Sequence, residues 1–74
     1  MTRNPVNEKE VHRRFTYHPP SEDQIKRYEE LRGTAAQFAR IIMTLTPESR
    51  EQSLALTHLD EVVMFANAAI ARNE

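Results

Sequence analysis

Apolar residues recur at helical spacing in two long segments of this chain of 74 residues. The first segment covers residues 21–45, where gaps of three and four predominate, as in an amphipathic helix rather than a strand. Its apolar positions are Ile25, Tyr28, Leu31, Ala35, Phe38, Ala39, Ile42 and Leu45. Ser21 and Gln24 form the pattern of a capping box, so we expect the helix to start there, directly after Pro20.

The second segment covers residues 47–72 and is apolar around more of its circumference. Thr46 is a suitable N-cap, and Pro47 fits the first helical position. One stripe of apolar residues is widened by neighbours on both sides: Leu54, Ala55, Leu56, Leu59, Val62, Val63, Met64, Phe65, Ala66, Ala68, Ala69 and Ile70. The first helix can cover only one face of such a helix, so the remaining apolar surface needs another partner.

The short connection around Thr46 predicts that the two helices are antiparallel neighbours. In the preceding residues 1–20, "NPVNEKEVHRR" can form a short helix with Asn4 as cap and Pro5 in its first turn. The sequence therefore predicts an all-α fold in a single domain, residues 1–74. This fold is an antiparallel two-helix hairpin preceded by a short N-terminal helix or extended segment. A lone hairpin encloses no core, so we expect a compact homo-oligomer.

Composition narrows the function classes. The formal net charge is −1, which does not suit a protein that coats DNA or an anionic membrane. No apolar run approaches the length of a membrane span, and the N-terminus lacks the apolar stretch of a signal peptide, so we expect a cytoplasmic protein. The absence of cysteine excludes disulfides and thiolate metal sites.

Catalytic and metal sites find little support in the residue pattern. His58 and Glu61, three positions apart, form half of a carboxylate-bridged di-metal motif, but the matching helices with glutamates are missing. Glu8 and His12 are more typical of a solvated contact on a helix face. No activated nucleophile or acid–base pair is recognisable, so we expect neither catalysis, nor a metal, nor a cofactor.

Basic and aromatic residues converge around the stretch "RRFTYHPP", residues 13–20. Tyr28 and Arg32 follow on one face of the first helix, at positions i and i+4. Arginine offers a planar fork for phosphate oxygens and tyrosine a ring for a base, so the combination suggests a nucleotide ligand. The candidate residues are Phe15, Tyr17, Lys26, Tyr28 and Arg32. In the alternative interpretation, Phe15 and Tyr17 pack across the first helix to protect the hairpin, and the arginines are solvated. Gly33 either permits a close approach of another backbone or ligand or is simply tolerated.

The segments "RRFTYHPPSEDQIKRYEELR", "PESREQSLAL" and "EVVMFANAAIARNE" carry a resemblance to a known family. The chain, over residues 12–74, resembles the phage helical-hairpin sponges that block CBASS immunity. These proteins share their hairpin domain with the sponges that block Thoeris immunity.

This resemblance implies a phage-encoded protein in the host cytoplasm that binds cyclic di- and trinucleotide second messengers without cleaving them. It also implies a homohexamer with cyclic dinucleotide sites between protomers, where Tyr17 and Arg32 match the family's tyrosine and basic residue. Thr34 and Arg72 match the residues of a separate cyclic trinucleotide site.

Two other classes of protein compete with a sponge. A small oligomeric adaptor would bind a helix of another protein through the spare apolar face. A weak nucleotide hydrolase would need a nucleophile, a base or a metal set that the pattern does not show. The sequence leaves open which cyclic nucleotide is preferred and whether Thoeris-type cyclic ADP-ribose signals bind.

Overall fold

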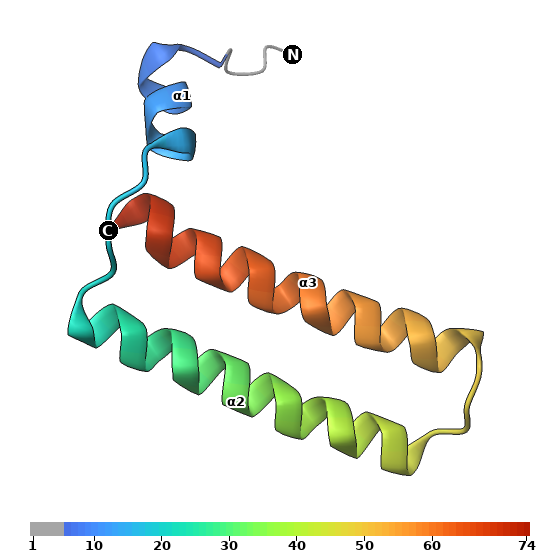
Figure 1. Ribbon diagram of the computed structural model, residues 1–74. Helices are drawn as coiled ribbons and strands as arrows, with labels where there is room; N and C mark the ends of the chain where they lie inside the picture. Colours follow the sequence, from blue (N-terminus) through green and yellow to red (C-terminus); the bar gives the residue numbers. More distant parts are fainter. Residues whose placement is uncertain (1–5) are drawn as a thin grey trace.

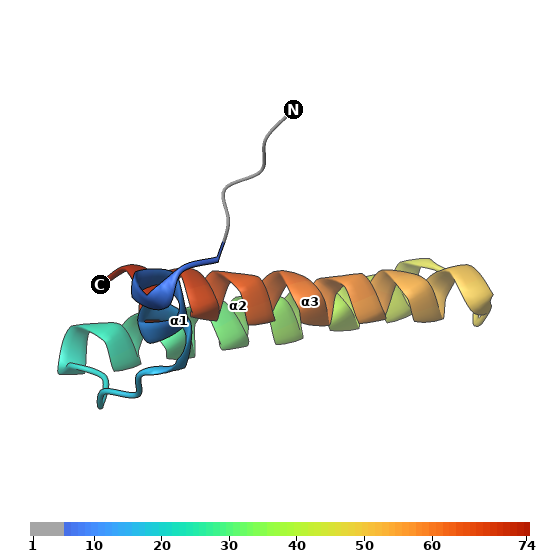
Figure 2. The same cartoon turned by 90° about the horizontal axis from the view of Figure 1, so that it is seen from above.

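The computed structural model describes residues 6–74, which form helices and connecting segments without a strand, so the expected all-α class is confirmed. Helix α1 spans Glu8–Phe15, α2 spans Glu22–Leu45 and α3 spans Arg50–Asn73. Helices α2 and α3 have 24 residues each and lie side by side in opposite directions (Figure 1). The short helix α1 lies at the end of this hairpin that carries the last turn of α3 (Figure 2).

The start of α2 follows from its sequence. The hydroxyl of Ser21 accepts a hydrogen bond from the Gln24 N–H at 3.2 Å, and the Gln24 side-chain oxygen accepts one from the Ser21 N–H at 2.9 Å. This reciprocal pair satisfies two backbone donors that the helix itself leaves free. The predicted capping box is therefore confirmed, and it fixes the point at which the chain enters the hairpin.

The predicted start of α3 at residue 47 with Thr46 as N-cap is wrong. Thr46 instead ends α2, because both its N–H and its hydroxyl donate to the carbonyl oxygen of Ile42, at 3.1 and 2.7 Å. The N-cap of α3 is Ser49, whose hydroxyl accepts from the Gln52 N–H at 3.1 Å. Residues 46–49 are thus the connection between the helices, and the helix begins three residues later than expected.

Helix α1 begins at Glu8, and its N-cap is Asn7, whose side-chain oxygen accepts from the Glu10 N–H at 2.9 Å. The expected cap Asn4 and the expected first-turn Pro5 lie outside the described residues. At the other end, the Thr16 N–H donates to the His12 carbonyl at 3.0 Å, and the chain continues as an extended segment. Residues 16–20 then connect α1 to α2, and we refer to them as the linker.

None of the described side chains is buried from solvent. Half-buried apolar side chains line the seam where α2 meets α3, and they include Leu31, Ala35, Ala39, Ile42, Leu56, Leu59, Val63, Ala66 and Ile70. Other large apolar side chains face outward: Phe65 is 73% exposed and Leu45 is 76% exposed. The described residues of a single chain therefore have an apolar seam but no enclosed core.

Gly33 lies within α2, where glycine costs about 1 kcal/mol relative to alanine. Among residues 6–74, no atom lies within 4 Å of the position that a Cβ would occupy, apart from its chain neighbours and the helix backbone. Within the described part of one chain, the missing side chain therefore permits no close approach. Any approach that requires glycine here has to come from a ligand or from another copy.

Because Ser49 and not Thr46 caps α3, we expect Ser49→Ala to lower the free energy of unfolding by about 1 kcal/mol. Ser53→Ala is the matched control. Ser53 lies one turn inside the helix, where alanine is the better helix former, so its unfolding free energy should stay equal or rise slightly. Urea unfolding at one fixed protein concentration measures both. Equal stability of Ser49→Ala and the parent would contradict this assignment of the cap.

Candidate functional site

A hollow of about 240 Å³ lies where the linker crosses the first two turns of α2 and the end of α3. It is lined by Thr16, Tyr17, His18, Pro20, Gln24, Tyr28 and Ala71. We call it the tyrosine hollow, because two of the candidate residues, Tyr17 and Tyr28, come together in it. They come from different elements, the linker and α2, so the fold and not their spacing brings them to one place.

The two rings of the tyrosine hollow differ in exposure. Tyr28 is half-buried, whereas Tyr17 is 81% exposed. Phe15 is also exposed, to 77%, and is not among the residues that line the hollow. The structure therefore contradicts the interpretation in which Phe15 and Tyr17 pack across α2 as hydrophobic cover. Tyr17 instead presents a largely free ring beside a second aromatic residue.

Arg32 lies one turn beyond Tyr28 on the same side of α2. It lines a groove of about 410 Å³ between α2 and α3, together with mostly apolar residues and Asp60. Among residues 6–74, Arg32 has no hydrogen-bond or ion-pair partner. Arg32 is therefore a cation without a partner among these residues, four positions from Tyr28 along α2, and it is available for an anionic ligand.

Lys26 is not brought to the same place. It precedes Tyr28 by two residues, which corresponds to about 200° around a helix, and it does not line the hollow. Of the five residues expected for a dinucleotide ligand, the single chain thus gathers Tyr17 and Tyr28, with Arg32 adjacent. Lys26 and Phe15 lie elsewhere on its surface.

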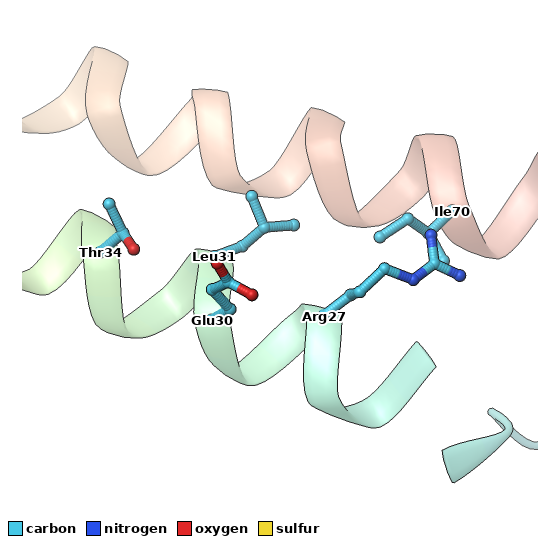
Figure 3. A pocket seen from close by; sticks show the side chains of 5 residues that line it. All are labelled: Arg27, Glu30, Leu31, Thr34 and Ile70. Atoms are coloured by element: carbon cyan, nitrogen blue, oxygen red, sulfur yellow. The ribbon is translucent and has the colours of Figure 1, made fainter. Parts of the chain in front are cut away.

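Thr34 lies on the other side of α2 from Arg32, because it is two positions further along the helix, which corresponds to about 200° of rotation. It lines a second hollow of about 310 Å³ with Arg27, Glu30, Leu31 and Ile70 (Figure 3). Arg72, the other residue expected for a trinucleotide ligand, is exposed in the last turn of α3 and does not line this hollow. Within one chain, Thr34 and Arg72 therefore do not form a joint site.

Arg27 joins α2 to the end of α3, a contact that the sequence did not predict. Its guanidinium donates to both carboxylate oxygens of Glu74, in one case at 2.8 Å, and to Asp23 at 3.0 Å. Hydrogen bonds from Arg27 and Gln24 lower the pKa of Glu74 from 4.5 to about 2, and Glu74 raises the pKa of Arg27. This arginine is accordingly neutralised within the chain, in contrast to Arg32.

A second arginine cluster ties α1 to α3. Arg13 and Arg14 both donate to Glu10, at 2.6 and 2.7 Å, and these bonds lower the pKa of Glu10 from 4.5 to about 2. Arg13 also donates to the side-chain oxygen of Asn73 at 3.0 Å. Both arginines of the "RR" pair are thus paired with Glu10 within α1, and Arg13 also contacts the last turn of α3.

Metal and acid–base chemistry gains no support from the geometry. His58 Nδ1 lies 2.9 Å from the Glu61 carboxylate, on an exposed face of α3. In the described part of the chain, no three His, Asp or Glu side chains are grouped so that they could hold a metal ion. What the arrangement offers is a binding surface of aromatic rings and a free guanidinium.

Helix α3 is long and apolar enough, by length and composition alone, to cross a membrane, with a mean hydropathy of 1.3 over its most apolar window. The expectation that no apolar run approaches the length of a membrane span is therefore wrong for α3. Two facts favour a helix that packs on protein. Its half-buried side chains face α2, and Asp60 and Glu61 lie near its middle, where an aspartate costs about 2.5–3.5 kcal/mol in a bilayer.

Comparison with known proteins identifies the class of this hairpin. Residues 7–71 match the family model of the Acb2/Tad1 hairpin domain, and the chain belongs to this family. Membership implies an anti-defence function as a sponge for cyclic nucleotides, which is binding and not catalysis. No curated protein and no solved structure matched the chain.

Because Glu10 and Glu74 have lowered pKa values, we expect the stability of the folded protein to fall in acid over a defined pH interval. Glu10 and Glu74 have lower pKa values in the folded protein than the ordinary 4.5, so they stabilise it above this pH. This contribution disappears as the pH falls from about 4.5 toward about 2. We expect the double variant Glu10→Gln/Glu74→Gln to lose less stability than the parent over that interval.

Urea unfolding across this pH interval, at constant protein concentration, measures the difference. Glu51→Gln is a control, because Glu51 makes no ion pair with another described residue. Parallel pH curves for the parent and the double variant would contradict the prediction, since other carboxylates would then cause the acid sensitivity.

Proposed function

We propose that this protein is a phage-encoded anti-CBASS sponge that sequesters cyclic di- and trinucleotide messengers in the host cytoplasm without cleaving them. The observation that carries the proposal is the pairing of Tyr17 with Tyr28 in one hollow, with the unpaired Arg32 one turn away. An exposed ring suits a nucleobase, and a free guanidinium suits a phosphate. Membership in the Acb2/Tad1 family supplies the ligand class.

The dinucleotide site in this proposal is shared between copies of the chain. A cyclic dinucleotide carries two bases and two phosphates, whereas one chain offers one tyrosine hollow and one Arg32. Two base stacks at about 1–3 kcal/mol each and two charge-assisted contacts at about 1.5–3 kcal/mol each total roughly 5–12 kcal/mol. Nanomolar affinity requires about −12 kcal/mol after the costs of association, so a site from two preformed copies fits better than a site from one.

Assembly into a homohexamer is part of the same proposal. The outward apolar side chains Leu45, Leu54 and Phe65 need cover that α2 and α3 do not provide within one chain. Packing of further copies would supply this cover and would also allow Thr34 of one copy to meet Arg72 of another. A trinucleotide site between copies is consistent with the separation of these two residues in the single chain.

A second candidate, an adaptor that binds a helix of another protein, rests on the same outward apolar side chains. Incubation of the protein with a cyclic dinucleotide, followed by filtration, heat release and anion-exchange chromatography, separates the candidates. The sponge is expected to remove the dinucleotide from solution and return it intact, and light scattering of the same sample is expected to show a hexamer. A cleaved product would contradict the sponge, and failure to deplete any of a panel of cyclic di- and trinucleotides would favour the adaptor.

Substitution of Tyr17 or Arg32 tests the dinucleotide site directly. Tyr17→Ala removes a stacking face and Arg32→Ala removes a phosphate contact, each worth about 1–3 kcal/mol per copy. Because a two-copy site loses each contact twice, calorimetry should show affinity weakened by on the order of 10²-fold or more. The loss from Arg32→Ala should shrink as salt increases, and the loss from Tyr17→Ala should not.

Arg50→Ala is the charge-matched control for Arg32→Ala. Arg50 begins α3, at the end of the hairpin opposite to the tyrosine hollow, so its removal should leave affinity near that of the parent. Oligomeric size is measured on the same samples. Variants of Tyr17 and Arg32 that keep both the parental size and the parental affinity would remove these residues from the site.

A further inference from the structure

The linker that carries Tyr17 is attached to the hairpin only through its flanks. Within the described chain, residues 17–20 make no hydrogen bond to either α2 or α3. Pro19 and Pro20 limit the conformations of the segment, but they do not fix its direction relative to the hairpin. The place of the Tyr17 ring beside Tyr28 therefore depends on what holds the two flanks.

The flank formed by α1 is held by one contact between elements far apart in sequence. Arg13 donates from Nη1 to the Asn73 side-chain oxygen at 3.0 Å, and its other nitrogens donate to Glu10 at 3.1 and 2.6 Å. Asn73 donates from its Nδ2 to the carbonyl of Ala69 at 2.9 Å, so its oxygen is directed toward Arg13. Both partners are thus oriented by bonds within their own helices before they meet.

The flank formed by α2 is held by Glu74, the residue that follows Asn73. Glu74 accepts from Arg27 at 2.8 Å and from Gln24 at 3.3 Å, and Gln24 also belongs to the capping box of Ser21. Asn73 and Glu74 therefore bind opposite flanks of the linker. Two residues before Asn73, Ala71 forms part of the wall of the tyrosine hollow.

Little else restrains α1. It has 8 residues, none of them buried, and an isolated helix of this length is marginal in water. Of its two apolar residues, Phe15 is 77% exposed and Val11 is 37% exposed, so apolar packing restrains α1 only through Val11 and the polar contact between Arg13 and Asn73 is its main tie to α3. Without this contact, α1 and the linker can take many directions, of which only some bring Tyr17 to the hollow.

We infer that Arg13 and Asn73 form a clamp that positions the Tyr17 ring over the tyrosine hollow for ligand binding. Both are positioning residues, since they act on the ligand through Tyr17. The inference rests on the proposed function for its ligand and on the contacts above for its mechanism. The apparent affinity is proportional to the fraction of molecules that have the ring in place. If loss of the clamp leaves one molecule in ten with the ring in place, binding weakens about tenfold.

The first experiment needs no ligand. The chain has two tyrosines and no tryptophan, so protein with ¹³C-labelled tyrosine rings gives ring signals from Tyr17 and Tyr28 alone. Arg13→Ala is expected to move the Tyr17 signals toward those of an unfolded chain. Arg14→Ala is the matched control, because Arg14 shares the bond to Glu10 but makes none to α3, and it should leave Tyr17 in place. Unchanged Tyr17 signals in Arg13→Ala overturn the clamp.

The second experiment measures affinity for a cyclic dinucleotide in a double-mutant cycle. Arg13→Ala is expected to weaken binding about tenfold in the parent and to have no further effect in the Tyr17→Ala background. Asn73→Leu removes the acceptor for Arg13, so it should behave like Arg13→Ala. Equal losses in both backgrounds would overturn positioning and would assign Arg13 to ligand contact or assembly.

The two experiments separate failure of the clamp from failure of the proposed function. A parent protein that binds no cyclic nucleotide contradicts the sponge, while the tyrosine signals still decide whether Arg13 holds Tyr17 in place. Light scattering on each variant shows whether a loss of affinity follows a change in oligomeric size. A loss that occurs only with a change in size overturns the clamp as its cause.

Discussion

Two antiparallel helices shield only the seam between them, because every other direction around the pair stays open to solvent. In this protein the seam is made by residues such as Leu31, Leu59 and Val63, and even these are only half-buried. Hydrophobic stabilisation is roughly proportional to the apolar area removed from water, at about 25 cal/mol per Å². A single hairpin of this kind therefore obtains little stability from its own side chains, and its shape relies on helix caps and polar contacts at its ends.

The polar contacts are concentrated where α1, the linker, the start of α2 and the last turn of α3 meet. Arg13 and Arg27 are each held by a carboxylate near in sequence and by a partner near the end of the chain. Exposed pairs of this kind contribute little to global stability, typically about 0–1 kcal/mol. Their effect is local, because they decide where a flexible segment with an aromatic ring lies relative to α2.

The periodic parts of the fold could be predicted from the sequence, and the contacts between distant segments could not. The apolar spacing indicated both long helices, and Ser21 with Gln24 indicated the start of α2. Thr46 and Ser49 are both good caps, and only the geometry of the connection shows that one ends α2 and the other begins α3.

For the site, spacing along one helix was informative and residue type alone was not. Tyr28 and Arg32 were expected on one face, and their positions follow from the helix geometry. Lys26 has the right charge, but it lies about 200° away from Tyr28 around the same helix, which the sequence could have shown. The contacts of Arg13 with Asn73 and of Arg27 with Glu74 span 60 and 47 residues, and no local pattern encodes such pairs.

The half-buried seam also has a thermodynamic consequence. If copies of the chain cover one another's outward apolar side chains as proposed, then folding, association and ligand capture are linked equilibria that draw on the same interfaces. The midpoint of thermal unfolding would then rise with protein concentration and with bound ligand, as it does for any assembly whose protomer is weakly stable alone. In such an assembly, a cyclic nucleotide bound between copies would also act as a structural element, and under the proposed function the captured signal would stabilise the protein that captures it.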